Sequence, residues 1–178
     1  RRQIVFQDPY SSLDRRQTAE DGLHEILSVH FAMLRQARTA RIATLMDQVG
    51  LSVREAGALP SALSGGQRQR VAIMRALALE PELLVLDEAV SALDVCVQAQ
   101  ILNLLAELRA ELGLTYLFVS HDLAVVAQIS ERILVLRQGK VVDSGATSDV
   151  LEGPKHAYTQ MLIDSVPGPG WQPSRRLH

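Results

Sequence analysis

The segment Leu83-Leu84-Val85-Leu86-Asp87-Glu88 places four aliphatic residues directly before two carboxylates. A short run that is apolar on both faces is typical of a central strand in a parallel sheet, which is covered on both sides. We therefore expect a strand over 83–86 with Asp87 and Glu88 at its carboxyl end. Ligands of open parallel sheets bind beyond that end of the strands, so both carboxylates are candidate site residues.

Helices and strands alternate on either side of this segment. Gly50 and Gly113 are expected to end the helices before them, and Asp94 to cap the helix after it. The alternation indicates an α/β fold with a largely parallel sheet. The expected elements are a strand at 3–6, helices from 18, over 42–49, from 64 and from 94, a buried strand at 114–119, a helix at 123–129, a hairpin over 132–143, and short helices near 149 and at 158–163.

Composition narrows the class of protein. The 178 residues are 47% hydrophobic and 21% charged, which is ordinary for a globular domain. The net charge is −2 and the basic residues are scattered, so nothing indicates nucleic-acid binding. Cys96 is the single cysteine, and the longest apolar runs fall far short of the roughly 20 residues of a membrane span. Because the chain starts at Arg1 within an apparent strand, we expect it to be part of a longer protein.

Three further polar clusters carry candidate chemistry. Ser64-Gly65-Gly66-Gln67 stands at the start of an expected helix, where a hydroxyl and glycine amides suit a phosphate group. His121 and Gln7 follow expected strands. Each cluster also has a simpler interpretation: a glycine turn, a satisfied polar residue or a loop amide. An acidic pair such as Asp87-Glu88 can likewise cap the next helix or face solvent.

Taken together, five stretches resemble the nucleotide-binding subunits of ATP-binding cassette (ABC) transporters over about residues 3–165. Leu63-Ser64-Gly65-Gly66-Gln67 matches the signature motif of that family in full. The other four are Leu83 to Glu88 for the Walker B strand, Ser91-Ala92-Leu93-Asp94 for the D-loop, Ser120-His121-Asp122 for the switch histidine, and Gln7 for the Q-loop. The order of the five motifs is that of the family.

The resemblance implies ATP and Mg²⁺ as ligands. Asp87 would hold Mg²⁺ through its water shell, Gln7 would sense Mg²⁺ and water, and Glu88 would be the general base. His121 would bind the γ-phosphate and the attacking water. Two subunits of the family sandwich two ATP molecules, in a homo- or heterodimer, so the signature residues Ser64, Gly65, Gly66 and Gln67 would serve the nucleotide of a second ATPase subunit. The resemblance also implies that Gln7 and the D-loop residue Asp94 bind nucleotide.

The same resemblance implies a domain organisation. Residues 1–13 would be a strand and the Q-loop of a partial P-loop NTPase (RecA-like) core, and residues 14–80 an inserted α-helical subdomain that ends in the signature motif. Residues 81–165 would complete the ATPase core. Residues 166–178 are expected to be a flexible tail, because they offer little to bury.

Two stretches point to one branch of the family. Phe6-Gln7-Asp8-Pro9-Tyr10-Ser11-Ser12-Leu13 and Gly153-Pro154-Lys155-His156-Ala157-Tyr158-Thr159 look like dipeptide, oligopeptide and nickel importers. This implies transmembrane permease subunits, an extracytoplasmic solute-binding protein, and a peripheral place on the cytoplasmic face of a bacterial inner membrane. The alternatives are an ABC-type ATPase that acts on DNA or ribosomes, and a non-catalytic partner module.

The sequence departs from the family in two places. A Walker A loop needs Gly, four residues, Gly-Lys and Ser or Thr; Gly139-Lys140 is the nearest match but is followed by Val141. We therefore expect these 178 residues alone to hydrolyse no ATP. Ala89 stands where many relatives carry proline after the glutamate, which leaves both carboxylates in place.

Overall fold

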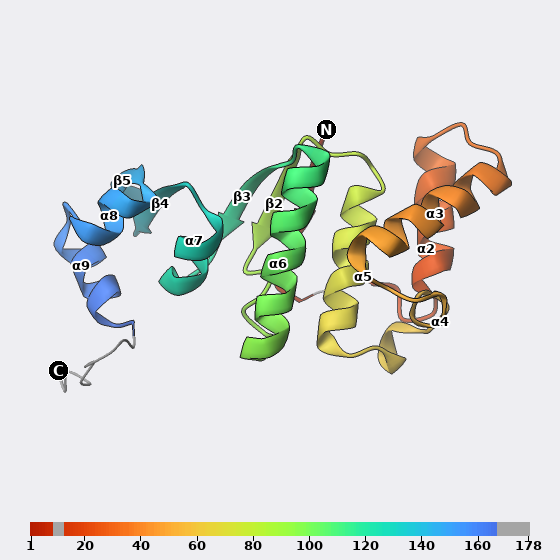
Figure 1. The fold of residues 1–178 in the computed structure, drawn as a ribbon, viewed down its shortest axis with the longest axis horizontal. Helices are drawn as coiled ribbons and strands as arrows, with labels where there is room; N and C mark the ends of the chain where they lie inside the picture. Colours follow the sequence, from red (N-terminus) through yellow and green to blue (C-terminus); the bar gives the residue numbers. More distant parts are fainter. Residues whose placement is uncertain (9–12, 167–178) are drawn as a thin grey trace. The chain divides into compact units, whose positions relative to one another are not determined.

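The computed structural model describes residues 1–8 and 13–166, which form two compact units, one within Arg1–Val119 and one within Ser120–His178 (Figure 1). Residues 9–12 of the first predicted loop and 167–178 of the predicted tail lie outside the described residues. The division of the chain into residues 1–13, 14–80, 81–165 and 166–178, which the family resemblance implies, stays a prediction. None of the helices in the described ranges combines the length and apolar character needed to cross a bilayer.

The first unit is built on a parallel sheet of three strands in the order β1 (Arg2–Val5), β2 (Leu83–Asp87) and β3 (Thr115–Val119). The prediction that residues 83–86 form a central strand is confirmed. In the register, Val5 lies opposite Leu86, and Asp87 lies opposite Val119. The carboxyl ends of the strands therefore meet at one edge of the sheet, where Asp87 lies.

Two helices, α5 (Gly65–Leu77) and α6 (Val95–Leu112), pack with the sheet around the core of this unit (Figure 1). The Tyr116 hydroxyl donates a hydrogen bond to the Leu105 carbonyl of α6 at 2.8 Å, and burial raises the pKa of Tyr116 to about 12. Because Tyr116 lies opposite Leu84, α6 covers the face that carries Leu84. The largest buried side chains of this core include Ile73, Met74, Leu84, Leu86, Ile101, Leu105 and Leu108.

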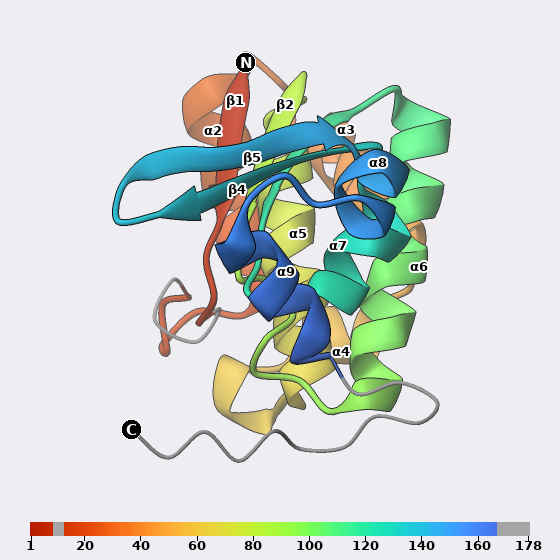
Figure 2. The same ribbon diagram turned by 90° about the vertical axis from the view of Figure 1, so that its left-hand side faces the viewer.

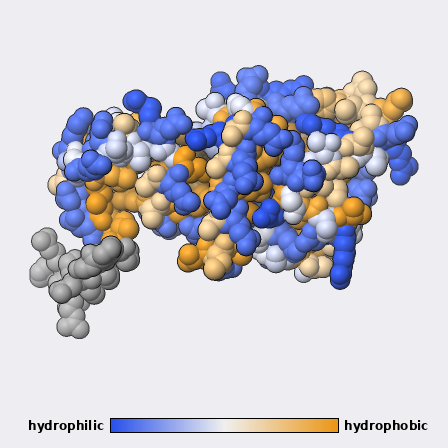
Figure 3. Space-filling view, viewed as in Figure 1, coloured by the Kyte–Doolittle hydropathy of each residue, from blue (hydrophilic) through white to orange (hydrophobic). Residues whose placement is uncertain are grey.

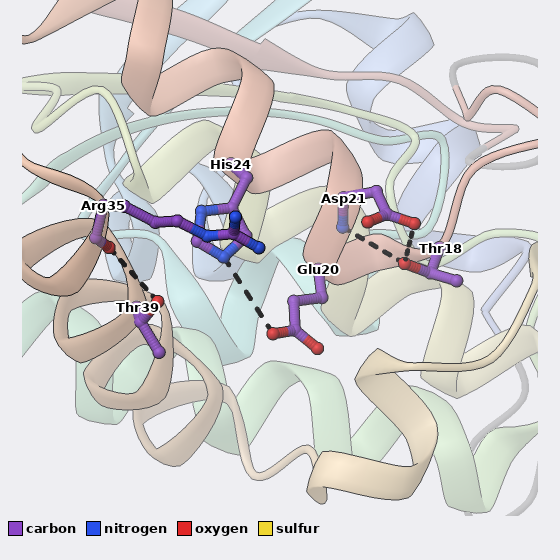
Figure 4. Close-up of polar contacts among 6 residues, drawn as sticks. All are labelled: Thr18, Glu20, Asp21, His24, Arg35 and Thr39. Atoms are coloured by element: carbon purple, nitrogen blue, oxygen red, sulfur yellow. Dashed lines mark hydrogen bonds and ion pairs between the residues drawn. The ribbon is translucent and has the colours of Figure 1, made fainter.

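A helical region connects β1 to α5. It contains α2 (Ala19–His30), α3 (Arg35–Val49), α4 (Val53–Ala56) and a 3-10 turn, η1 (Pro60–Ala62). The Thr18 hydroxyl caps α2, since it accepts the Asp21 N–H at 3.1 Å and donates to the Asp21 carboxylate at 2.7 Å (Figure 4). Gly50 ends α3 with a φ of 65°, so the predicted glycine stop is confirmed.

The expectation that residues 114–119 form a buried strand is wrong for one face of β3. Leu117 is 49% exposed and Val119 is 44% exposed. Ile4, which shares a row with Val85 and Leu117, is 51% exposed. A parallel strand is buried only when both faces of the sheet are covered, and among the described residues of this unit the helices cover the Leu84 face. Figure 3 shows apolar side chains reaching the surface in several separate patches.

Over residues 120–166, the second unit consists of a hairpin and three helices (Figure 2). The predicted hairpin is confirmed as antiparallel, and its turn residues Gln138 and Gly139 both have positive φ, 51° and 74°, which suits a type I′ turn. Ile133, Val135 and Val150 form the buried core of this unit. Its elements are α7 (Leu123–Ile129), β4 (Arg132–Arg137), β5 (Lys140–Ala146), α8 (Thr147–Glu152) and α9 (Ala157–Asp164).

A buried carboxylate ties β5 to the segment before α9. Asp143 is 5% exposed, and its Oδ1 accepts the Ser144 N–H at 2.9 Å. Its Oδ2 accepts the backbone N–H groups of Lys155 and His156 at 2.8 Å and 3.3 Å. The stretch 153–159, which resembles peptide importers, is thus anchored to the hairpin by this side chain.

We expect Asp143→Asn to lower the thermal midpoint of the second unit at neutral pH. Burial by itself would raise the pKa of the Asp143 carboxyl, but hydrogen bonds, led by the Lys155 N–H, hold it below its ordinary value. A carboxyl with a lowered folded pKa stabilises the fold above its unfolded pKa, about 3.9, and this stabilisation is lost as the pH falls through the folded value.

The midpoint difference between wild type and Asp143→Asn should therefore shrink on acidification, as followed by thermal unfolding at a series of pH values. Glu152→Gln, which changes an exposed carboxylate of α8, is the control and should leave the midpoint unchanged. A difference that stays constant down to strongly acidic pH would contradict the role given to Asp143.

Candidate functional site

Three of the predicted residues share the carboxyl edge of the first unit's sheet. Gln7 follows β1 by two residues, Asp87 ends β2, and Glu88 comes next. Because Val5 lies opposite Leu86 in a parallel pair, the chain positions of Gln7 and Glu88 emerge from the same edge of the sheet. Gln7 and Asp87 are exposed, whereas Glu88 is half-buried. The edge therefore presents carboxylate and amide oxygens to the space beyond the strands.

The backbone of Glu88 has an unusual conformation. Its φ is 47°, in the left-handed region that residues other than glycine rarely occupy. Hydrogen bonds hold it there: its N–H donates to the Val119 carbonyl at 2.9 Å, and its carbonyl accepts the N–H and the hydroxyl of Ser91 at 3.1 Å and 3.0 Å. Left-handed residues of this kind cost about 1–3 kcal/mol and cluster at functional sites. The left-handed backbone therefore distinguishes Glu88 from Asp87 as a candidate catalytic residue.

The predicted signature segment forms the start of α5. Ser64 is the N-cap: its Oγ accepts the Gln67 N–H at 3.3 Å, and the Gln67 side chain accepts the Ser64 N–H at 2.8 Å. This reciprocal pair is a capping box, which fixes the first turn of a helix. Ser64 is exposed, so its hydroxyl and the positive end of α5 are open to an anion.

The two signature glycines also pack against the segment that contains the predicted D-loop. A Cβ added to Gly65 would come within 3.3 Å of Leu93, and one added to Gly66 within 2.5 Å of Val97. Asp94, whose carboxylate accepts the Val97 N–H at 3.0 Å, caps α6 as predicted. The structure therefore brings residues 64–67 and 91–97 together. Glycine is therefore required here for packing against Leu93 and Val97, in addition to any role of its backbone amides in binding phosphate.

Gly66→Ala is expected to destabilise the first unit by about 1–3 kcal/mol, because its methyl group would overlap Val97. Val97→Ala should relieve the overlap, so a double-mutant cycle by denaturant unfolding should show a strong favourable coupling. Gly22→Ala in α2 is a matched control, since its nearest contact is a flexible glutamine at 3.8 Å and alanine favours a helix. Additive effects of Gly66→Ala and Val97→Ala would contradict the packing.

His121 belongs to the second unit and is exposed. Its neighbour Asp122 caps α7, with Oδ1 accepting the N–H of Ala124 at 2.9 Å and of Val125 at 3.4 Å. Ser120 Oγ accepts the Asp122 N–H at 3.0 Å. Asp122, and not His121, is therefore the N-cap of α7. The catalytic role of His121 stays a prediction.

Glu55 is a residue of this region that the motifs did not indicate. It lies in α4 and accepts a hydrogen bond from the Gln67 side chain at 2.5 Å. The pattern Ser52-x-x-Glu55 is a capping box and could have been found by its spacing. The contact between Glu55 and Gln67 could not be found from spacing, because it is a tertiary contact between side chains of two separate segments.

The donor set fits a magnesium nucleotide better than a metal held by protein alone. In the described part of the chain there is no group of three or more His, Cys, Asp or Glu residues that could hold a metal ion. Mg²⁺ is commonly bound by one or two protein oxygens together with phosphates and water. Asp87 and Gln7 offer such oxygens at the sheet edge.

Solved structures of ATP-binding cassettes share the fold described above. CbiO1 from Clostridium perfringens, described as part of the ABC transporter complex cbiONQ, superposes with a TM-score of 0.76 at 29% identity, over 85% of this chain and 59% of that one. The ATP-binding cassette MJ0796, in a dimeric post-hydrolysis state bound to ADP and Pi, superposes with a TM-score of 0.69 at 34% identity, over 82% of this chain and 63% of that one.

Curated relatives are more similar in sequence. The glutathione import ATP-binding protein GsiA of Pectobacterium atrosepticum is 51% identical over 174 residues, 98% of this chain and 28% of that protein. GsiA of Escherichia coli K12 is 49% identical over 165 residues, 93% of this chain and 26% of that protein. The chain thus spans about a quarter of the length of these relatives.

The sequence model of the ABC transporter family matches residues 1–91, which is more than half of the 178 residues. The matched part contains β1, the whole helical region, the signature segment and the carboxylates at the end of β2. This chain is a member of the ABC transporter family.

Proposed function

We propose that this chain is part of the ATP-binding subunit of an ABC importer, which hydrolyses ATP to drive the uptake of a peptide-type solute. The observation that carries the proposal is the end of β2, where Asp87 and Glu88 stand at the carboxyl edge of the sheet and Glu88 is fixed in a left-handed conformation. An acidic pair in this place suits nucleotide hydrolysis.

In this proposal each residue at the edge has a separate task. Asp87 and Gln7 would hold Mg²⁺, which would supply positive charge against the phosphates. Glu88 accepts a proton from the attacking water and orients that water toward the γ-phosphate. The proposed role of His121, binding the γ-phosphate, rests on its motif alone, since this residue belongs to the second unit. The hydrogen bonds from Ser91 to the Glu88 carbonyl keep the backbone of the base in place during the reaction.

The signature segment serves the nucleotide of a second ATPase subunit. Ser64 is exposed at the positive end of α5, and the amides of Gly65 and Gly66 lie in its first turn. Such an end binds an anionic phosphate group. Asp94 fixes the start of α6, against which these glycines pack. That one solved relative is described as a dimer bound to ADP and Pi supports this arrangement.

The names of the relatives support an importer of peptide-type solutes. Those described above are named glutathione import ATP-binding proteins, and glutathione is a tripeptide. We propose a peptide of this size as the solute, with nickel as the other candidate of the branch. Permease subunits and an extracytoplasmic solute-binding protein are the proposed partners, on the cytoplasmic face of a bacterial inner membrane. A solved relative is described as part of an ABC transporter complex, which supports the permease partners.

Reconstituted transport tests the proposal. The intact gene product would be purified with its co-purifying membrane subunits, inserted into vesicles and supplied with ATP, the solute-binding protein and labelled glutathione. We expect ATP-dependent uptake that excess unlabelled small peptide suppresses and nickel salts do not. Uptake of nickel instead would change the solute, and an ATPase that co-purifies with nucleic acid or ribosomes rather than with membrane subunits would overturn the importer assignment.

A further inference from the structure

We propose that Glu55 is a positioning residue for the signature segment, acting through the side chain of Gln67. This inference rests on the proposed function, because it assigns Glu55 a part in the ATPase reaction. The observation behind it is a continuous chain of hydrogen bonds from α4 to the first turn of α5, in which Glu55 and Gln67 are the two central members.

The Gln67 carboxamide is held at both of its ends. Its Oε1 accepts the Ser64 N–H at 2.8 Å, and its Nε2 donates to Glu55 Oε1 at 2.5 Å. A carboxamide has one end that accepts and one that donates, and a carboxylate only accepts. Glu55 therefore selects the orientation in which the oxygen of Gln67 faces the Ser64 N–H. In the reversed orientation, two donors would face each other at Ser64.

Glu55 is itself fixed. Its Oε2 accepts the Ser52 N–H at 2.7 Å and the Ser52 hydroxyl at 2.6 Å, as part of the capping box of α4. The two capping boxes, 52–55 and 64–67, are thus joined by the single hydrogen bond between their third helical residues. Both oxygens of the carboxylate are used, so its rotation would break contacts on both sides.

The charge of Glu55 matches this role. Hydrogen bonds from the hydroxyl and the backbone of Ser52 lower the pKa of the Glu55 carboxyl, with smaller contributions from Gln67 and the nearby Arg70. The carboxylate is therefore ionised at neutral pH, and a charged acceptor makes a stronger hydrogen bond than a neutral one. Arg70 is anchored in turn, since its guanidinium donates to the Val49 carbonyl at the end of α3.

The consequence lies at Ser64. Its N–H is held by Gln67 and its hydroxyl accepts the Gln67 N–H, so the orientation of the N-cap depends on the carboxamide that Glu55 fixes. In the proposed reaction this N-cap faces the γ-phosphate of the partner subunit's nucleotide. A displacement of α4 would move this N-cap through the hydrogen bond between Glu55 and Gln67. Glu55 thus connects the helical region to the phosphate-binding end of α5.

The test compares Glu55→Ala, Glu55→Gln and Ser52→Ala in the intact ATPase with its partner subunits. Glu55→Ala should lower kcat about tenfold while the affinity of a single subunit for ATP stays within about twofold, since contacts of the nucleotide with its own subunit are untouched. Glu55→Gln keeps one acceptor oxygen that can face Gln67 and should restore part of kcat. Ser52→Ala removes the hydroxyl bond to Glu55 but keeps the Ser52 N–H and Gln67 as its donors, and should lower kcat by clearly less than Glu55→Ala does.

A second readout does not depend on turnover. Amide hydrogen exchange in the first turn of α5 should speed up in Glu55→Ala and by clearly less in Ser52→Ala. Equal kcat values or equal exchange in these two variants would overturn the positioning role, because a merely structural effect of α4 would appear in both. If the wild type shows no ATP turnover, the proposed function fails, while the exchange measurement still decides whether Glu55 orders the signature segment.

Discussion

Glu88→Gln in the intact protein is expected to lower ATP turnover by about 100-fold or more, with ATP binding retained. A positioned general base contributes roughly 10²–10⁴ in rate, and the amide cannot take the proton from water. The substitution keeps the size of the side chain, so the left-handed backbone at this residue and its hydrogen bonds to Val119 and Ser91 should persist. Steady-state turnover and equilibrium nucleotide binding measure the two quantities.

Glu82→Gln is the matched control. It makes the same chemical change beside the amino end of β2, where the Glu82 side chain is 91% exposed, and should leave turnover unchanged. Loss of turnover in both variants would point to a general effect of charge. Full turnover in Glu88→Gln would remove Glu88 from the reaction and leave Asp87 or His121 to be tested as the base.

Gly65→Asp is expected to have an effect of similar size for another reason. It places a carboxylate in the first turn of α5, where we propose that the γ-phosphate of the partner's nucleotide binds. Repulsion there should cost about 10²–10³ in turnover, as loss of an anion-stabilising group commonly does. A negative charge at this end favours the helix itself, which should offset the close contact of a Cβ at this position with Leu93, so unfolding should change little. Turnover and denaturant unfolding, measured together, separate the two effects.

Ala99→Asp is the control for added charge. Ala99 is exposed on α6, away from the first turn of α5, and the same substitution there should preserve turnover. If Gly65→Asp lowered stability and turnover in parallel, the contact of Gly65 with Leu93 would be the cause instead of phosphate binding. Normal turnover in Gly65→Asp would contradict the proposed task of the signature segment.

Local chemistry allowed much of the fold to be predicted. Gly50 and Gly113 were expected to end helices, and both have a φ of 65°. The central strand over 83–86 followed from its apolar run and from the acidic pair after it. The exposed face of β3 could not be predicted in this way, because the apolar sequence of a strand does not reveal whether other elements cover both of its faces.

The site was predictable to the extent that its residues stand in motifs. Asp87 and Gln7 lie at the sheet edge because parallel strands end together. The left-handed φ of Glu88 depends on hydrogen bonds to β3 and to Ser91, which no local pattern contains. The fit of Gly66 against Val97 and the contact of Glu55 with Gln67 are likewise tertiary, so they required the structure.

In the proposed dimer, Glu88 of one subunit acts with the signature segment of the other. The most direct test is the turnover of purified mixed dimers in which one subunit carries Glu88→Gln and the other Gly65→Asp, selected by two different tags. We expect turnover well above that of either variant paired with itself, because one site keeps an intact Glu88 and an intact signature segment. Turnover as low as in the uniform variants would contradict it, since both residues would then serve the nucleotide of their own subunit.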